Sequence, residues 1–356
     1  MAQIDYIFLQ KFIWHSIFIL IISLFLFLII IKYSNRLIKI DKIQIQNIHS
    51  GNISRLGGLV IFLVCSSYIF FYLKELNHLI LFSLIIITPA ILEDLMVEIK
   101  PIIRLICILF GSFLIIYNIE YLPFFDFKFN YIFNNYHFKL IFFTIALTAV
   151  INGQNIIDGT NGLSALSGLS IFSSLLYLGV LVEDYQVINI SIIFITLLFS
   201  FLLFNYPFGR IFLGDSGSYF TGLVAGYVTI YLFGKYDFLP TWTAAIILYY
   251  PSQEVIFSYF RKILTNKSPF MADNNHLHLK VYYLLSNNMI KRPQLYNSLV
   301  APFLSMLWVT PLALVPFSIQ NNFVSFIGLI MMAIIYFCIF FALPNPKTNN
   351  NTKKVN

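Results

Sequence analysis

The chain of 356 residues is 59% hydrophobic and only 10% charged, with a mean hydropathy of +0.83. Because a soluble globular protein usually carries about a quarter charged residues, this composition excludes that class and indicates a polytopic membrane protein. The formal net charge of +7 does not indicate nucleic-acid binding, because the Lys and Arg residues are scattered between apolar runs and form no single patch.

Apolar runs long enough to cross about 30 Å of hydrocarbon recur along the chain. They lie at 12–31, 56–73, 79–92, 103–119, 139–155, 163–182, 187–205, 216–233, 240–260, 296–316 and 323–343. We therefore expect about eleven transmembrane helices in a single all-α catalytic domain at residues 1–343. The run at 79–92 is short and contains Pro89, and without it the side of every later loop would reverse. The Asn- and Lys-rich stretch 344–356 is expected to be a disordered cytoplasmic tail.

The positive charges sort the loops onto two sides of the membrane. Seventeen of the 22 Lys and Arg residues fall on the side that holds loops 32–55, 93–104, 206–215, 261–295 and the C-terminal tail. By the positive-inside rule this side faces the cytoplasm, so the N-terminus lies outside and the C-terminus inside. Seven acidic residues from distant segments share the cytoplasmic side: Glu93, Asp94, Glu98, Asp158, Asp215, Glu254 and Asp273.

The first two cytoplasmic loops carry groups suited to phosphate and metal chemistry. Arg55, followed by Gly57-Gly58 at the start of a span, can present a fork-shaped donor to a phosphate, although a basic residue in such a loop also serves to fix topology. Glu93 and Asp94 directly follow the third span. An adjacent carboxylate pair suits a divalent cation or a phosphoryl centre, and the alternative is a solvated helix end.

The stretch 152–163 is the most unusual part of the chain. It places Asp158 and the side-chain amides of Asn152, Asn155 and Asn161 between two long apolar segments. Such groups are costly at membrane depth unless they face water, protein or a substrate, which indicates a functional site. The alternative is turn chemistry, because Asp and Asn beside Gly are common in turns.

The segment 210–218 reads Arg-Ile-Phe-Leu-Gly-Asp-Ser-Gly-Ser and leads into the eighth span. A helix N-terminus favours phosphate, and Gly214 and Gly217 would let backbone N–H groups approach a ligand. Asp215, between these glycines, can hold Mg²⁺. The alternative is a helix cap made by Asp215 or Ser216, which would not explain why glycines flank these residues.

The basic loop after the ninth span contains His276-Leu-His278. Two residues apart, the imidazoles lie on one face only where the segment is extended. The absence of Cys or further His partners disfavours a zinc pair, so contact with a pyrophosphate beside Lys267, Asp273 and Lys280 is the better interpretation. A solvated pair of histidines is the alternative.

These motifs, in this order between about 49 and 280, resemble the polyprenyl-phosphate N-acetylhexosamine-1-phosphate transferases. The shared patterns are Arg-Leu-Gly-Gly, the acidic pair, Asn-x-x-Asn-x-x-Asp-Gly-x-Asn-Gly-Leu, Phe-Leu-Gly-Asp-x-Gly-Ser and His-Leu-His. The expected eleven spans with the N-terminus outside are also similar to the topology of the WecA-like branch. The related phospho-MurNAc-pentapeptide translocase carries more histidines in the last motif than Leu279 and Lys280 allow, which favours the WecA-like branch.

The resemblance implies four catalytic carboxylates. Asp215 would hold Mg²⁺, or Mn²⁺ in its place, and Glu93 and Asp94 would stand at the reacting phosphates. Asp158 would shape the nucleotide-sugar site with Asn155. The family pair is usually Asp-Asp, and the extra methylene of Glu93 leaves its role open.

The resemblance also implies substrate contacts by Asn155, Asn161, Phe212, His276 and His278, beside the phosphate contact expected for Arg55. Asn161 and Phe212 would lie near the uracil, and the two histidines would contact the diphosphate or the sugar. Asn161 replaces an Asp that is common in bacterial members, and its amide can still pair with the edge of uracil.

The implied reaction is attack by an undecaprenyl-phosphate oxygen on the sugar-proximal phosphorus of a UDP-N-acetylhexosamine, with release of UMP. It would start the synthesis of a surface glycan, O-antigen or cell-wall polymer, at the cytoplasmic face of a bacterial inner membrane. Direct displacement is favoured over a covalent route through Asp94 or Asp158. The phospho-MurNAc-pentapeptide translocase reaction and a non-catalytic carrier are competing functions. The apolar outer spans are compatible with a homodimer.

Overall fold

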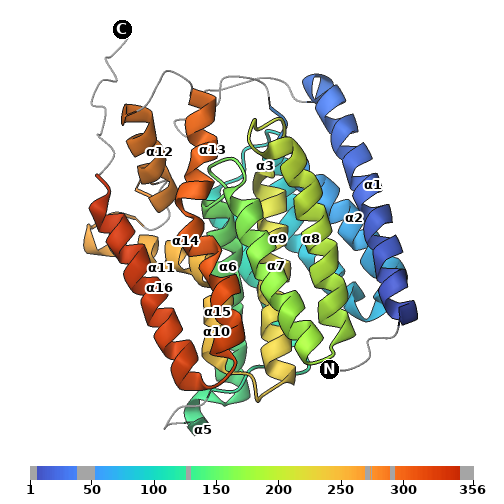
Figure 1. The fold of residues 1–356 in the computed structure, drawn as a ribbon, viewed down its shortest axis with the longest axis vertical. Coiled ribbons are helices and arrows are strands. Elements are labelled where there is room, and N and C mark those ends of the chain that lie inside the picture. Colours follow the sequence, from blue (N-terminus) through green and yellow to red (C-terminus); the bar gives the residue numbers. More distant parts are fainter. Residues whose placement is uncertain are drawn as a thin grey trace.

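A computed structural model describes residues 6–37, 53–125, 130–268, 273, 275–288 and 293–344. Within these ranges the chain is helical, without a strand, and most helices run side by side along one axis (Figure 1). The predicted tail beyond Pro344 and most of the first basic loop fall outside the described residues.

The helices are distributed evenly along the chain. The first half holds α1 (Tyr6–Leu37), α2 (Gly57–Tyr72), the 3₁₀ turn η1 (Lys74–Leu76), α3 (Asn77–Asp94), α4 (Pro101–Tyr117), α5 (Asn130–Phe133), α6 (Tyr136–Ile156), and α7 (Leu163–Leu181). The second half holds α8 (Tyr185–Asn205), α9 (Gly214–Lys235), α10 (Thr241–Ile247), α11 (Tyr249–Leu264), α12 (Leu277–Asn288), α13 (Pro293–Phe303), α14 (Ser305–Trp308), α15 (Thr310–Ser318) and α16 (Asn322–Ala342).

Six helices in the described part of the chain are long and apolar enough to cross a membrane, and a bent pair at 295–318 would make a seventh. Large apolar side chains such as Phe18, Phe70 and Phe341 are exposed on the outside of the bundle, where lipid would cover them. The prediction of an all-α, multi-pass membrane protein is therefore confirmed. The number of eleven spans and their orientation stay predictions.

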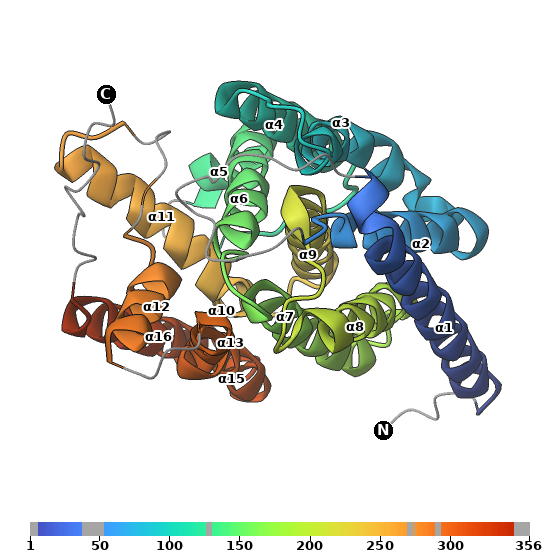
Figure 2. The same ribbon diagram turned by 90° about the horizontal axis from the view of Figure 1, so that it is seen from above.

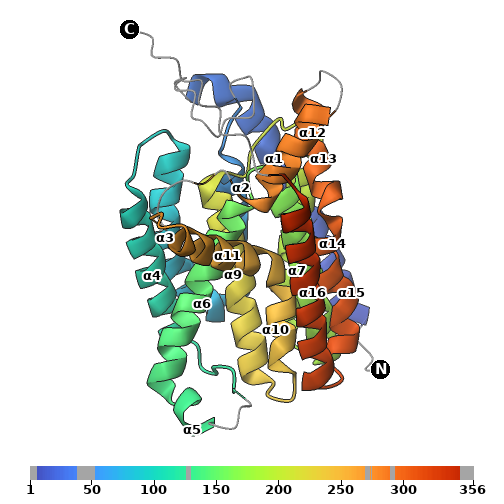
Figure 3. The ribbon, with the colours of Figure 1, turned by 90° about the vertical axis from the view of Figure 1, so that its left-hand side faces the viewer.

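Nine of the eleven predicted runs fall on single helices, including the short run at 79–92, which is α3 with Pro89 inside it. The prediction of one continuous helix at 240–260 is wrong. α10 ends at Ile247, and α11 crosses the bundle instead of following its axis (Figure 3). Pro251 supplies the reason, because its ring clashes with the carbonyl four residues earlier, at Ile247, and it has no N–H to donate. The run at 296–316 is likewise broken, with a bend of 46° between its halves.

α9 lies at the centre of the bundle, among α2, α3, α6, α7 and α8 (Figure 2). Nearly all of its residues are buried, and it is rich in Gly, Ser and Thr. A Cβ on Gly222 would lie 2.9 Å from the Cα of Ile151 in α6, so the small residues let neighbouring backbones approach closely. Because protein surrounds α9, it does not need the apolar surface of a lipid-facing helix.

The predicted cytoplasmic motifs gather at one end of the bundle, the upper end in Figure 1. The C-terminal end of α3, the α6–α7 connection, the start of α9 and α12 all lie there, whereas α5 lies at the opposite end. Segments far apart in the sequence are thus brought to a common face.

Candidate active site

The site is built on a backbone pairing between the start of α2 and the segment before α9. Phe212 N donates to Ser54 O at 2.8 Å, Gly57 N to Phe212 O at 3.0 Å, and Gly58 N to Leu213 O at 2.8 Å. A Cβ on Gly58 would lie 2.0 Å from the backbone nitrogen of Gly217 in α9, so only glycine fits there. This contact explains the Arg-Leu-Gly-Gly pattern and brings Arg55 to the start of α9.

Asp94 caps the N-terminus of α9 from another helix. Its carboxylate accepts the backbone N–H groups of Asp215 and Ser216, each at 2.9 Å, and the Ser216 hydroxyl at 2.6 Å. The free N–H groups of a helix start and their partial positive charge favour such a carboxylate. Asp94 has no exposed surface, and both of its oxygens are engaged.

The glycines around Asp215 admit neighbouring parts of the protein. The expectation that their N–H groups also approach a ligand stays a prediction. Gly214 has φ +76°, and a Cβ there would lie 2.2 Å from the carbonyl oxygen of Arg55 and 2.6 Å from the Asp94 carboxylate. The alternative, a cap by Asp215 or Ser216, is wrong, because Asp94 of α3 caps the helix instead.

The side chain of Asp215 lies between two arginines. Arg55 Nη2 donates to its Oδ1 at 2.9 Å, and Arg104 Nη1 donates to its Oδ2. Arg104 is also 3.9 Å from Glu93 Oε1, and Arg55 Nε is 3.8 Å from Asp94 Oδ1. Three carboxylates from α3 and α9 thus surround two guanidinium groups.

Arg104 is a site residue that the sequence reasoning missed. It lies in the first turn of α4, ten residues beyond the acidic pair, and its side chain is largely buried between Glu93 and Asp215. The available signal was its place on the same cytoplasmic loop as the pair. It was counted only as a topology charge because Lys and Arg have that role by default in such loops.

Asp158 and Asn155 approach the same cluster from the α6–α7 connection. Asn155 Nδ2 donates to Ser218 Oγ in α9 at 3.1 Å. Burial raises the pKa of Asp158 well above its ordinary range, Arg55 lowers it, and Asp215 and Asp94 raise it further. These charges act on Asp158 because it lies beside the cluster.

The two histidines lie next to this connection. Their rings stack with centroids 5.8 Å apart and planes 9° apart; His276 lies directly before α12, and His278 lies in its first turn. His278 is 2% exposed, and a Cβ on Gly159 would lie 2.5 Å from its Nε2. Burial lowers the pKa of His278 to about 3, His276 lowers it as well, and Glu254 raises it.

Asn161 is buried and held by hydrogen bonds to other parts of the protein. Its Nδ2 donates to Pro207 O at 2.9 Å, and its backbone N–H donates to Asn297 Oδ1 at 2.7 Å. It therefore joins the α6–α7 connection to the segment before α9 and to α13. Phe212 is only partly buried and lies directly before Leu213. A contact of either residue with uracil stays a prediction.

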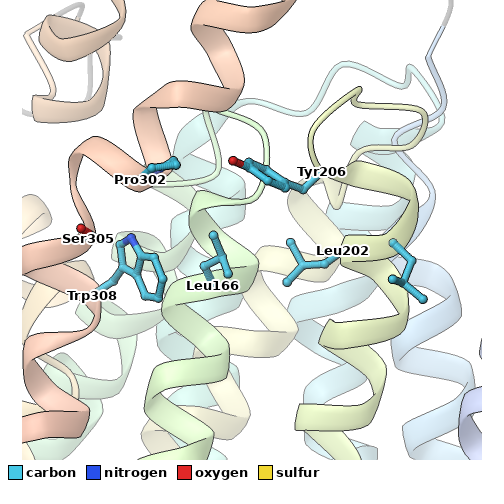
Figure 4. Close-up of a pocket in the computed structure, with 7 residues that line it drawn as sticks. Leu166, Leu202, Tyr206, Pro302, Ser305 and Trp308 are labelled. Atoms are coloured by element: carbon cyan, nitrogen blue, oxygen red, sulfur yellow. The ribbon is translucent and has the colours of Figure 1, made fainter.

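Two apolar cavities lie outside the acidic cluster. The larger, of about 720 Å³, runs along α6, α9, α10, α11 and α16, with Phe138, Phe142 and Trp242 among its lining residues. The smaller, of about 510 Å³, lies between α7, α8 and the α13–α14 segment (Figure 4). Its lining residues are Leu166, Leu202, Leu203, Tyr206, Pro302, Ser305 and Trp308.

The donor chemistry of the cluster fits Mg²⁺, which prefers carboxylate oxygens. Asp215 and Glu93 offer carboxylate oxygens that face the arginines, whereas those of Asp94 are taken by N–H and O–H donors of α9. Among the described residues, no three His, Cys, Asp or Glu side chains form a closed metal site.

Comparison with known proteins gives concordant matches. Residues 76–233, which include all four predicted catalytic carboxylates, match the sequence model of glycosyl transferase family 4. The undecaprenyl-phosphate alpha-N-acetylglucosaminyl 1-phosphate transferase of Thermotoga maritima is 26% identical over 183 residues, which cover 51% of this chain and 50% of that protein. The probable undecaprenyl-phosphate N-acetylglucosaminyl 1-phosphate transferase of Bacillus subtilis is 28% identical over 275 residues, which cover 72% of this chain and 75% of that protein.

Proposed function

Because this chain belongs to glycosyl transferase family 4, the polyprenyl-phosphate N-acetylhexosamine-1-phosphate transferases, we propose that it transfers N-acetylhexosamine 1-phosphate from a UDP-sugar to undecaprenyl phosphate and releases UMP. The reaction takes place at the cytoplasmic face of a bacterial inner membrane and starts the synthesis of a surface glycan. In this proposal the chain crosses the membrane eleven times, with its N-terminus outside and its C-terminus in the cytoplasm.

The observation that carries the proposal is the pair of arginines between the carboxylates at one end of the bundle. Arg55 and Arg104 both pair with Asp215, and Arg104 also lies 3.9 Å from Glu93. Guanidinium groups also bind phosphate oxygens through paired hydrogen bonds, so both side chains can exchange Asp215 for a diphosphate with little movement. Asp215 would then be available to hold a metal ion, with Glu93 beside it.

Positioning and charge neutralisation are the main contributions of the protein to phosphoryl transfer. A bound Mg²⁺ would supply further neutralisation of the diphosphate oxygens. Asp94 holds the start of α9 in place and thereby fixes Asp215. Asn155, through Ser218, holds the end of α6 against the same helix.

A direct displacement needs no catalytic base. The second pKa of a phosphate monoester is about 6, so the lipid phosphate is mostly dianionic at neutral pH. The geometry disfavours a covalent route through Asp94, because both oxygens of this carboxylate accept hydrogen bonds from α9.

The larger apolar cavity suits the isoprenoid chain of the lipid substrate. Its lining is dominated by aromatic and aliphatic side chains of α6, α10 and α11. Val150, one of these residues, lies five positions before Asn155 on α6, which corresponds to about 8 Å along the helix. A chain in this cavity can therefore bring its phosphate to the end of α6, where the acidic cluster lies.

The test is release of UMP by the purified protein in the presence of undecaprenyl phosphate and Mg²⁺. A panel of UDP-GlcNAc, UDP-GalNAc and deoxy-amino UDP-sugars identifies the sugar. UMP from UDP-MurNAc-pentapeptide alone would assign the chain to the peptidoglycan translocases, and no UMP from any donor would favour a carrier. The collection of ionisable groups at one end of the bundle argues against a carrier, which would need them near the middle of its spans.

A further inference from the structure

Glu254, on α11, is a buried carboxylate without a part in the mechanism above. It is 1% exposed, and three groups donate to it: His276 Nδ1 at 3.1 Å, the backbone N–H of Leu277 at 3.0 Å and the Tyr336 hydroxyl at 2.8 Å. The donors come from α16, from the start of α12 and from the residue before it. Such a set keeps the buried charge satisfied and fixes its position.

We propose that Glu254 is a positioning residue for the transfer reaction and acts through His276; this inference rests on the proposed function. An ionised carboxylate only accepts hydrogen bonds, so the contact keeps a proton on Nδ1 of His276. Nε2 is then the ring atom that can face the diphosphate, to which it donates a hydrogen bond in the doubly protonated form of the ring, and the carboxylate fixes the ring orientation. Because Glu254 also caps the first N–H of α12, ring and helix are held as one unit.

The position of His276 is passed on to the acidic cluster by direct contacts. His276 stacks on His278, and His278 lies against Gly159, the neighbour of Asp158. On the other side, α11 packs closely against α6. A Cβ on Gly153 of α6 would lie only 2.1 Å from the carbonyl oxygen of Pro251, which is one turn before Glu254 on α11. A shift of Glu254 would therefore move the histidines relative to Asp158.

Other charged groups nearby do not replace Glu254. Arg261 Nη2 pairs with Asp273 Oδ2 at 2.6 Å, so each of these charges has a partner. The other ionisable neighbours of Glu254 are His278 and the three tyrosines Tyr249, Tyr250 and Tyr336. Glu254 is the carboxylate that contacts the His276 ring in this structure.

The test compares Glu254→Gln with wild type in UMP release. Glutamine keeps the size and one acceptor oxygen but removes the charge. We expect kcat to fall by about 10- to 100-fold, as for other residues that orient a functional histidine. The fall should appear in kcat, because Glu254 acts on the orientation of His276.

A double mutant separates positioning from structural support. If Glu254 acts through His276, then Glu254→Gln has no further effect on kcat in a His276→Asn protein. The matched control is Asp184→Asn, since Asp184 is also a buried carboxylate that caps a helix, α8, but it lies at the opposite end of the bundle. This control should lower the melting temperature without lowering kcat.

A wild-type kcat in Glu254→Gln, or an equal fall in the His276→Asn background, would overturn the positioning role while leaving the proposed function intact. Failure of the wild type to release UMP from any UDP-sugar would instead contradict the proposed function, and the inference with it. The two failures are thus distinguished by the wild-type assay alone.

Discussion

The Asp94 carboxylate binds the backbone of Asp215, and the Asp215 side chain contacts other residues. The Asp94 carboxylate accepts the N–H of Asp215 at 2.9 Å, across 121 positions of sequence, while the Asp215 side chain faces Arg55 and Arg104. The two acids therefore have different tasks: one fixes the start of the central helix, and the other presents a carboxylate at its tip.

Replacement of Asp94 tests this division. Asp94→Asn removes the charge that opposes the positive end of α9, and we expect a lower melting temperature together with loss of UMP release. Ser216→Ala removes only the hydroxyl hydrogen bond to Asp94 and should cost about 1.5–3 kcal/mol of stability. Both are measured by thermal unfolding in detergent. A phosphorylated Asp94 trapped from wild-type enzyme and detected by mass spectrometry would contradict the capping account.

Arg104 should contribute to diphosphate binding. Arg104→Ala leaves Asp215 with one cationic partner, and we expect kcat/KM for the UDP-sugar to fall by about 100-fold, which corresponds to about 2.7 kcal/mol. Arg104→Lys should recover little, because an ammonium group cannot make the paired contacts of a guanidinium. The measurement is steady-state UMP release with varied UDP-sugar. Equal activity of the alanine variant and wild type would remove Arg104 from the site.

Gly58 should tolerate no side chain. Its Cβ would lie 2.0 Å from the backbone nitrogen of Gly217, so Gly58→Ala must separate α2 from α9. We expect a loss of about 3 kcal/mol or more, together with loss of activity, because overpacking against backbone cannot relax. Gly328→Ala is the matched control, since its nearest neighbour is the end of the Ile246 side chain at 3.2 Å. Thermal unfolding of both variants decides the matter; equal stability of both would show that the helices can move apart.

The buried His278 makes stability depend on pH. Its folded-state pKa is lowered to about 3, whereas the ordinary value is 6.5. The neutral, buried imidazole therefore makes its full contribution to the free energy of unfolding above pH 6.5. This contribution is lost as the pH falls, by about 2 kcal/mol at about pH 5. We expect the melting temperature of wild type to fall more between about pH 7.5 and about pH 5 than that of His278→Gln. Identical pH profiles of melting would contradict a neutral, buried His278.

Much of the fold was predictable because its main signal is the length of apolar runs. Nine of the eleven apolar runs are single helices in the structure. The length of a run does not predict the effect of Pro251, which breaks the run at 240–260. The break matters for function, since it turns α11 across the bundle and brings Glu254 to the histidines.

The candidate site was predictable in its members but not in their roles. Glu93 and Asp94 are equivalent in sequence, yet successive helix positions point about 100° apart. Asp94 therefore turns to the start of α9, while Glu93 turns toward Arg104. Glu254 was also missed as a site residue, because a single acid at the edge of an apolar run has no local pattern. Its importance comes from contacts with α12 and α16, which only the folded chain reveals.

The most direct test of the account is UMP release by wild type and Asp215→Asn with undecaprenyl phosphate and the preferred UDP-sugar, with and without Mg²⁺. We expect wild type to release UMP only with the metal ion, and the variant to be slower by about 100-fold or more at every Mg²⁺ concentration. Magnesium-dependent turnover at the wild-type rate in Asp215→Asn would contradict the account.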